Sequence, residues 1–332
     1  MARPTEATIA VTFRCNSKCV MCNIWKEKDF QEIPPEAYSK LPGSLETINI
    51  TGGEPFLRKD LVEVIRNIHK AAPKSRIVIS TNGFLTDRTI ETVREIVRFH
   101  PNLGVGVSID GIGEMHDRIR GYPGGFEKAV ATVKALRAIG VTDLRLGMTI
   151  MPENSGQVMD VYKLARDLGV EFTTTVAHNS GIYFKKTDNR PGEVSGGLRA
   201  DLGTIGDEHL RSFGVKNWFR AYHLAGLTDP SIRSGAADKC AAARRFFYMD
   251  PSGNIYPCIV MDRVFGNIDK IDDFEAFFSS AEAESARKAV KGCREDCWMV
   301  CNIRSLIASH PKDSILWIAK NKPRVHVSRS RR

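Results

Sequence analysis

The sequence predicts an α/β fold: a partial (β/α)6 barrel of the TIM type, followed by a small Cys-rich domain. Three observations predict it. Short β-rich apolar runs alternate with segments whose apolar residues have helical spacing. Glycine and polar residues follow the ends of the β-rich runs. The eight cysteines fall into two groups, three within residues 15–22 and five within residues 240–301.

The alternation of β and α segments is the main evidence for the barrel. Strands are expected at 8–13, 47–50, 76–80, 103–109, 144–150 and 171–177, and helices at 59–71, 86–99, 125–138 and 155–168. Such alternation favours a parallel sheet with right-handed crossovers. Six units suit an open barrel better than a closed barrel of eight, and a doubly wound sheet is the competing architecture.

The chain divides into four expected parts. Residues 1–180 form the barrel, and residues 181–239 form a connector or substrate-covering segment, helical around 206–225. Residues 240–310 form the Cys-rich domain, and residues 311–332 form a basic tail expected to fray. Within that tail, 314–320 is amphipathic, and a packed helix there is favoured over contact with a membrane.

Composition narrows the function classes. The 332 residues carry a net charge of +9, much of it near the C-terminal end. No apolar run is long enough to span a membrane, and no signal peptide is visible, so a cytoplasmic protein is expected. A basic zinc protein that binds nucleic acid is the rival from another class, but the basic residues form no stripe with interleaved aromatics.

The first cysteine group provides three thiolates in one short loop. Cys15, Cys19 and Cys22 follow the first expected strand, with no fourth ligand nearby. A structural zinc site needs four ligands, and so does a cubane iron–sulfur cluster. Three cysteines on a cubane leave one iron open to chelate a cofactor or substrate. We therefore favour an iron–sulfur cluster over zinc.

The spacing of Cys15, Cys19 and Cys22, together with Gly52-Gly53-Glu54-Pro55 after the second strand, resembles the radical S-adenosylmethionine (SAM) superfamily. The resemblance covers residues 8–180 and implies a [4Fe-4S] cluster that reductively cleaves SAM. The resulting 5′-deoxyadenosyl radical would abstract a substrate hydrogen, with electrons from a donor such as flavodoxin or ferredoxin. All the motif residues are present, which ranks a fold that has lost catalysis below an active enzyme.

The resemblance also implies contacts with SAM. Gly52, Gly53 and Glu54, with Pro55 completing the motif, would hold the amino end, because glycine lets the backbone approach closely and a carboxylate accepts from an ammonium. The remaining expected contacts are Thr81, Asn82 and Ser108 with the ribose or methionyl part, Arg120 with the carboxylate, and Met21, where the family usually has an aromatic residue, with adenine. A turn role for Asn82 and a surface salt bridge for Arg120 are the alternatives.

The second cysteine group follows a predicted hairpin. Cys240 precedes it, a turn signal covers 250–254, and Cys258 lies at its far end. Cys293, Cys297 and Cys301 are spaced by four, which would place them on one face if the segment is helical.

Cys240, Gly253, Cys258, Cys293, Cys297 and Cys301 resemble the auxiliary-cluster module called SPASM, or its shortened form called twitch. The full module holds two extra clusters. The five cysteines here imply one auxiliary [4Fe-4S] cluster and one spare thiol, with zinc as the alternative. The spare thiol is a candidate hydrogen-atom donor, as in some radical SAM epimerases, or it is inert or a swapped ligand.

The substrate is less well determined. Asp110, His178 and Tyr183 follow expected strands and are candidate pocket residues, although a turn or helix cap is an alternative role for Asp110. We favour a small, carbohydrate-like substrate that is epimerised or dehydrogenated. A peptide maturase is the alternative. It ranks lower here because many such relatives carry an N-terminal leader-binding domain, and the first strand begins near residue 8.

Overall fold

A computed structural model of the chain describes residues 3–189, 195–236, 239–295 and 297–327, without the side chains of 300–302 and 327. Its central feature is a sheet with the strand order β6-β5-β4-β3-β2-β1-β7-β8-β9. The first six strands pair in parallel and in chain order. In a doubly wound sheet the order of the strands along the sheet would reverse near the middle. The fold is therefore the expected partial barrel.

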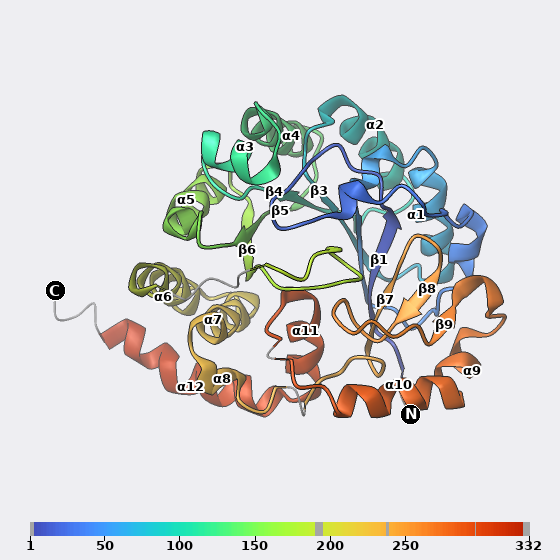
Figure 1. Ribbon diagram of the computed structural model, residues 1–332. Coiled ribbons are helices and arrows are strands. Elements are labelled where there is room, and N and C mark those ends of the chain that lie inside the picture. Colours follow the sequence, from blue (N-terminus) through green and yellow to red (C-terminus); the bar gives the residue numbers. More distant parts are fainter. Residues whose placement is uncertain (1–2, 190–194, 237–238, 296, 328–332) are drawn as a thin grey trace.

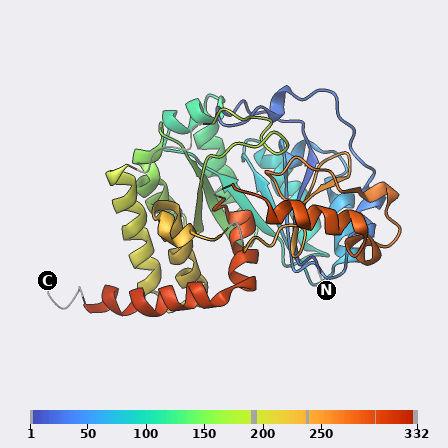
Figure 2. The same ribbon diagram turned by 60° about the horizontal axis from the view of Figure 1, so that its bottom comes forward.

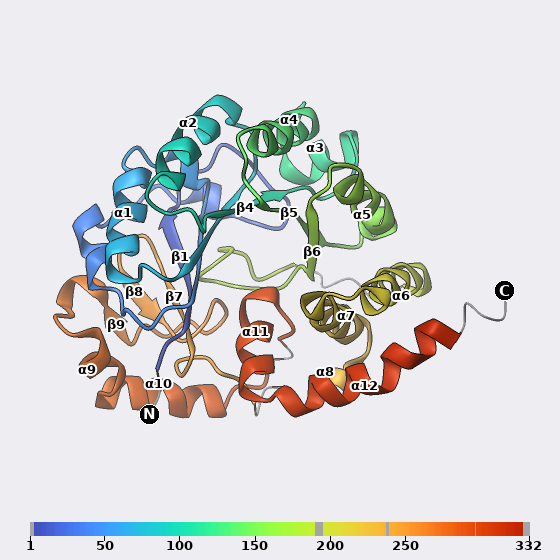
Figure 3. The ribbon, with the colours of Figure 1, turned by 180° about the vertical axis from the view of Figure 1, so that it is seen from behind.

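Every expected barrel strand is present. The strands are β1 Glu6–Thr12, β2 Thr47–Gly52, β3 Arg76–Thr81, β4 Gly104–Ser108, β5 Asp143–Ile150 and β6 Glu171–Val176. The helices α1 Leu61–Ala71, α2 Thr86–Val97, α3 Glu114–Arg120, α4 Gly125–Ala138 and α5 Val158–Asp167 form an arc around the outside of the strands (Figures 1 and 3). Short 3-10 turns lie at Ile24–Lys26, Pro35–Lys40, Pro55–Leu57, Ser155–Gln157 and Ile268–Lys270.

The barrel strands have an apolar outer side and a polar inner side. In β3, Ile77 and Ile79 are fully buried, whereas Arg76 and Ser80 line an internal cavity. This follows from the period of two in a strand, which sends alternate side chains to opposite faces. The interior of a closed TIM barrel is instead filled with layers of mostly apolar side chains. This barrel therefore encloses a cavity where a closed barrel has packed core.

Helices from later in the chain cover the open side of the barrel. These are α6 Gly196–Arg211, α7 Val215–Thr228, α8 Pro230–Arg233, α11 Val300–Ser309 and α12 Pro311–Val327. Figure 1 shows α11 between α7 and the strands that continue the sheet beyond β1. Two expectations were wrong: the helix expected at 206–225 is divided into two, and 311–327 is a helix packed on α6 and α7, not a frayed tail. Figure 2 shows α12 crossing the ends of those two helices.

The C-terminal part is joined to the barrel through the sheet. Strand β7 Phe246–Met249 pairs in parallel with β1, and β8 Asn254–Tyr256 returns antiparallel to it, which confirms the predicted hairpin. The remaining elements are β9 Gly266–Asn267, α9 Phe274–Phe278 and α10 Ala281–Lys291. None of the helices in the described ranges is both long and apolar enough to cross a membrane.

A buried arginine ties β1 to the segment that follows the cysteine loop. Arg58 is 1% exposed. Its guanidinium donates to the carbonyl oxygens of Val11 (2.8 Å) and Ile33 (2.6 Å) and to the Tyr38 hydroxyl (3.1 Å), and it pairs with Asp60 (2.8 Å). One side chain thereby satisfies several buried acceptors, which fixes the path of the chain below the site.

Replacing Arg58 with methionine is expected to lower the free energy of unfolding by about 3 kcal/mol, because buried carbonyl oxygens lose their donors. Urea denaturation of the variant and the unaltered chain measures the difference. Lys163→Met is the matched control, since its ion pair with Asp160 is exposed and spans 3.9 Å; it should cost less than about 1 kcal/mol. Equal effects from both substitutions would contradict the role given to Arg58.

Candidate active site

Many of the functional residues predicted from the sequence meet at one end of the internal cavity, which has a volume of about 820 Å³. The cysteine loop follows β1, and the other residues lie at or just beyond the carboxyl ends of later strands. Residues from this end that line the cavity are Cys15, Cys19, Met21, Cys22, Gly52, Gly53, Thr81, Asn82, Ser108, Arg120, His178 and Tyr183. The parallel topology places all of these strand ends on one side of the barrel.

The end of α3 holds the cysteine loop in place. The carbonyl oxygen of Arg120 accepts from the Ser17 hydroxyl (2.7 Å) and the Lys18 amide (3.0 Å), and the Val20 amide donates to Ile119 (2.9 Å). Gly121 adopts a left-handed conformation, and a Cβ there would lie 2.6 Å from the carbonyl oxygen of Lys18. The loop is therefore anchored to a helix whose short sequence we did not recognise.

The three thiols of the loop have the donor chemistry that an iron–sulfur cluster requires. Burial, and after it the field of Cys19, raises the pKa of both Cys15 and Cys22 to about 12. Because the three sulfurs lie close together, their thiolate forms are disfavoured without a bound cation. Coordination to iron would supply the missing positive charge. The Ile24 amide also lies 3.4 Å from the sulfur of Cys22, a contact suited to a thiolate acceptor.

The two glycines of the Gly52–Pro55 motif allow the end of β2 to lie directly against the cysteine loop. A Cβ on Gly52 would be 2.1 Å from the carbonyl oxygen of Thr12, and one on Gly53 would be 2.1 Å from that of Arg14. The amides of Gly53 and Glu54 donate to these same two carbonyls, each at 2.8 Å. Only a residue without a side chain permits this approach at both positions.

Glu54 has a different setting from the one we expected. It is fully buried, and its carboxylate accepts from the Thr81 hydroxyl (2.8 Å), the Asn82 amide (2.8 Å) and the Phe56 amide (3.2 Å). Burial raises its pKa to about 7 although these donors lower it. Within the described chain, Glu54 and Pro55 lie outside the cavity lining. The geometry therefore gives Glu54 the task of positioning Thr81 and Asn82.

Arg120 is directed into the site by a buried partner. Its Nε lies 2.6 Å from Oδ2 of Asp110, and its Nη1 lies 3.8 Å from the sulfur of Cys19. The Arg120 side chain is 12% exposed, which excludes a surface salt bridge. We expected Asp110 in the substrate pocket, but it is fully buried behind Arg120 and does not line the cavity. Its Oδ1 accepts from the Thr149 amide at 2.8 Å.

The other predicted pocket residues do face the cavity. The Tyr183 hydroxyl lies 3.1 Å from that of Thr51, and the His178 ring packs edge-on against Phe184. Burial lowers the pKa of His178 to about 4, so its ring is neutral near pH 7. Asn82 accepts from the Phe84 amide (3.0 Å), which is the turn role, and also donates to Asn16 (2.7 Å) in the cysteine loop.

The second cysteine group gathers beyond the hairpin. The pKa of Cys258 is raised to about 11 by burial and by the fields of Cys240 and Cys293. The pKa of Cys297 is raised by burial and by the fields of those three cysteines. These four thiols therefore lie within electrostatic range of one another. The amides of Val260 and Met261 lie 3.4 and 3.3 Å from the Cys258 sulfur. The side chain of Cys301 lies outside the described residues.

The last three cysteines do not lie on one face of a single helix. Cys293 and Cys297 precede α11, which begins at Val300. Among the described residues, no three Cys, His, Asp or Glu side chains form a group that could hold a metal ion. A single zinc ion would require its sulfurs about 2.3 Å from one centre, whereas a cubane binds each cysteine at a separate iron.

One apolar cluster connects the two cysteine groups. It includes Phe13, Tyr248, Tyr256 and Met299, and partly buried Cys15, Cys22, Cys258 and Cys297 pack against it. The hairpin thus presents its inner face to the cysteine loop. Both groups share one water-poor environment.

The opposite end of the cavity holds charged residues that the sequence analysis missed. They are Arg76, Arg145, Lys216, Arg220 and Arg304. The alternation in 76–80 and 144–150 places Arg76 and Arg145 on the inner face, and this signal was available in the sequence. Lys216, Arg220 and Arg304 reach the cavity because α7 and α11 pack over it, and this packing is a property of the tertiary structure.

Comparison with known proteins identifies the family. The sequence profile of the Radical SAM superfamily matches residues 9–165. The subtilosin biosynthesis protein AlbA of Bacillus subtilis is 26% identical over 83% of this chain, and the mycofactocin maturase MftC of Mycolicibacterium smegmatis is 28% identical over 77%. The chain spans 60% and 64% of the length of these relatives. The pre-heme d1 synthase of Dinoroseobacter shibae is 32% identical over 52% of this chain and 43% of its own length.

Solved structures share the fold. Streptococcus suis SuiB bound to S-adenosylmethionine has a TM-score of 0.65 at 16% identity, covering 86% of this chain and 68% of SuiB. Native anSMEcpe with bound AdoMet has the same TM-score and identity, covering 97% of this chain and all of that one. Motif, topology and profile agree that residues 9–165 form a domain of the radical SAM superfamily.

Proposed function

We propose that this chain is a radical SAM enzyme that modifies a peptide. The observation that carries the proposal is the shared cavity wall: a three-thiol loop, a glycine pair and a cavity-facing arginine line one end, and a second thiol group lies across an apolar cluster. Three thiols fit a cluster with one open iron, and a guanidinium fits a carboxylate.

The relatives support a peptide over the carbohydrate-like substrate that we first favoured. AlbA is named for the biosynthesis of a bacteriocin and MftC is named a maturase. Both align with more than three quarters of this chain, beyond the 52% that the pre-heme d1 synthase reaches. Alignments of this length cannot be confined to residues 1–180, so the similarity to the maturases extends beyond the barrel.

In this proposal the chain binds its cofactors with residues from both ends of the sequence. Cys15, Cys19 and Cys22 would hold a [4Fe-4S] cluster, which would supply the electron for reductive cleavage of SAM. Gly52 and Gly53 would offer their backbone to the amino acid part of SAM. Further contacts come from Met21, Thr81, Asn82 and Ser108.

Asp110 acts through Arg120. Because Asp110 occupies Nε of the guanidinium and Nη1 lies 3.8 Å from the Cys19 sulfur, Nη2 is the nitrogen left for a carboxylate in the cavity. A fully buried partner also limits the rotamers of Arg120. Asp110 is thus a positioning residue for SAM and not a contact of the substrate.

The second thiol group would hold an auxiliary [4Fe-4S] cluster through Cys240, Cys258 and two of Cys293, Cys297 and Cys301. The third of these last cysteines is the candidate hydrogen-atom donor. The fate of the substrate radical decides whether the reaction ends in a crosslink, a dehydrogenation or an epimerisation.

Iron analysis tests the two clusters. Anaerobically reconstituted chain is expected to bind about eight irons, falling to about four in the Cys15→Ala, Cys19→Ala, Cys22→Ala triple variant. Iron and sulfide assays with an absorption spectrum measure this. Four irons falling to none would reassign the second thiol group, and bound zinc without iron would overturn the proposal.

The reaction is tested with reduced, reconstituted chain, SAM and dithionite. We expect 5′-deoxyadenosine to form, and a short peptide encoded beside this gene to increase its amount and change in mass. The triple cysteine variant should do neither. Stimulation by sugars together with no effect of peptides would restore the carbohydrate substrate.

Gly53→Ala is expected to reduce cluster retention sharply, since its Cβ would displace the carbonyl of Arg14 and with it the cysteine loop. Gly156→Ala is the matched control, because a Cβ there meets nothing within 4 Å. Iron content after reconstitution is compared for both. Full iron in Gly53→Ala would show that the close approach is not required.

A further inference from the structure

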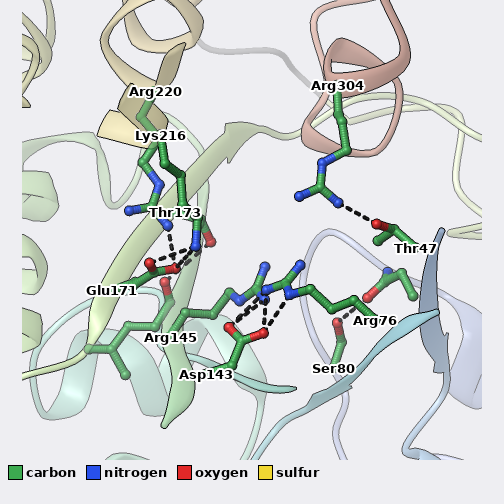
Figure 4. Close-up of polar contacts among 12 residues, drawn as sticks. Thr47, Arg76, Ser80, Asp143, Arg145, Glu171, Thr173, Lys216, Arg220 and Arg304 are labelled. Atoms are coloured by element: carbon green, nitrogen blue, oxygen red, sulfur yellow. Dashed lines mark hydrogen bonds and ion pairs between the residues drawn. The ribbon is translucent and has the colours of Figure 1, made fainter. Parts of the chain in front are cut away.

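The end of the cavity opposite the cysteine loop is lined by five cationic side chains, which we call the basic floor. They are Arg76 on β3, Arg145 on β5, Lys216 and Arg220 on α7, and Arg304 on α11. Figure 4 shows them converging from the strands on one side and the helices on the other. None of the family motifs includes these positions.

Two carboxylates hold part of the floor together. Asp143 accepts from Arg76 through Nε (2.6 Å) and Nη2 (2.8 Å), and from Arg145 at 3.2 Å. Burial raises the pKa of Asp143, but Arg76 and Arg145 more than offset this and keep it below its usual value. Asp143 therefore stays ionised and is already shared between two guanidinium groups.

The helical side is paired in a similar way. Glu171 accepts from Lys216 at 2.7 and 2.9 Å and also pairs with Arg220. Arg304 donates to the hydroxyl of Thr47 at 2.8 Å, a neutral partner (Figure 4). Its charge is thus balanced by no carboxylate in direct contact among the described residues.

Positive charge exceeds negative charge at this end. Among the described residues lining it, the one acid is Glu6, and Asp143 and Glu171 pair with lining cations from behind; together these acids are fewer than the five cations. His209 and His223 also line it, and burial lowers the pKa of each to about 4, so both are neutral near pH 7. The floor therefore carries a net positive charge in a partly buried setting.

Arg145 is only partly compensated by its ion pair with Asp143. Its side chain is 17% exposed, and its buried Nε–H has no hydrogen-bond partner in the described part of the chain. Burial and the neighbouring Arg76 lower its pKa, which means that both destabilise its charged form. A structural ion network would be expected to balance its charges, because buried uncompensated charge is destabilising. A bound anion would remove that cost.

We propose that the basic floor binds a carboxylate of the substrate, and that this carboxylate belongs to an acidic peptide. The inference rests on the proposed function, because the same cavity must hold the reacting segment. Arg76 and Thr81 lie at opposite ends of β3, about 16 Å apart at the rise of a strand. An extended peptide spans that length with about five residues. The acidic residue is therefore about five positions from the one that reacts.

Binding of small probes to the full, reconstituted chain tests the floor. The probes are acetylated, amidated tri-glutamate, the matching tri-glutamine, and benzene-1,2,4,5-tetracarboxylate, each followed by calorimetry. We expect tri-glutamate to bind, tri-glutamine not to bind, and the affinity to fall as salt is raised. Arg145→Gln with Arg304→Gln should weaken binding by about tenfold or more, the effect of losing a charge-assisted hydrogen bond.

The control removes two charges elsewhere. Lys59→Gln with Lys134→Gln alters exposed lysines outside the cavity and should leave tri-glutamate affinity unchanged. Thermal unfolding checks that the variants fold. If the double variant does not fold, Arg304→Gln alone, at an exposed position, replaces it in the binding measurement.

Each outcome has a distinct meaning. Equal affinity for tri-glutamate and tri-glutamine, or equal loss in the control, would overturn the floor as a carboxylate site. Binding of the tetracarboxylate alone would support the site and replace the peptide with a small polycarboxylate. If the wild-type chain cleaves SAM but binds no carboxylate, only the inference about the floor is overturned. If the chain binds tri-glutamate but cleaves no SAM, the proposed function is overturned instead.

Discussion

The close approach of two backbone segments is the constraint on which the site depends. The end of β2 can pass within hydrogen-bonding distance of residues 12–14 because Gly52 and Gly53 have no side chains. That contact sets the position of the cysteine loop, and the end of α3 holds the same loop from the other side. Glu54 then links this junction to Thr81 and Asn82 at the end of β3. The site is thus assembled mainly by backbone geometry and by two buried carboxylates, those of Glu54 and Asp110.

The open barrel explains why one cavity can have two chemically different ends. With six strands in chain order, the sheet does not close, and α7 and α11 complete the wall. Soft thiols and glycine backbone line the carboxyl ends of the strands, while arginine and lysine line the amino ends. A closed barrel with a packed interior would leave no room to join the two. Separating them along the strands keeps the cationic floor away from the cysteine loop.

Much of the fold followed from the sequence, because strand and helix periodicities are local. The barrel strands, the hairpin and the place of the first cysteine group after the first strand were predicted. Helix α3 was missed because seven residues give too little periodicity. The expected helical face of Cys293 and Cys297 was wrong since the helix begins only at Val300. The tail was expected to fray, but Lys322 donates to the carbonyl oxygens of Leu210 and Ser212, and no local signal reveals such long-range partners.

The pairing of β7 with β1 has a consequence for synthesis on the ribosome. The first strand of the chain completes its sheet only against residues 246–249, which emerge more than two hundred residues later. Until then one edge of β1 has no neighbour, and an unpaired edge strand invites association with other chains. The cysteine loop directly follows that strand. Maturation of the nascent protein is therefore governed by its last third, and chains truncated before the hairpin keep an open, aggregation-prone edge beside the thiols.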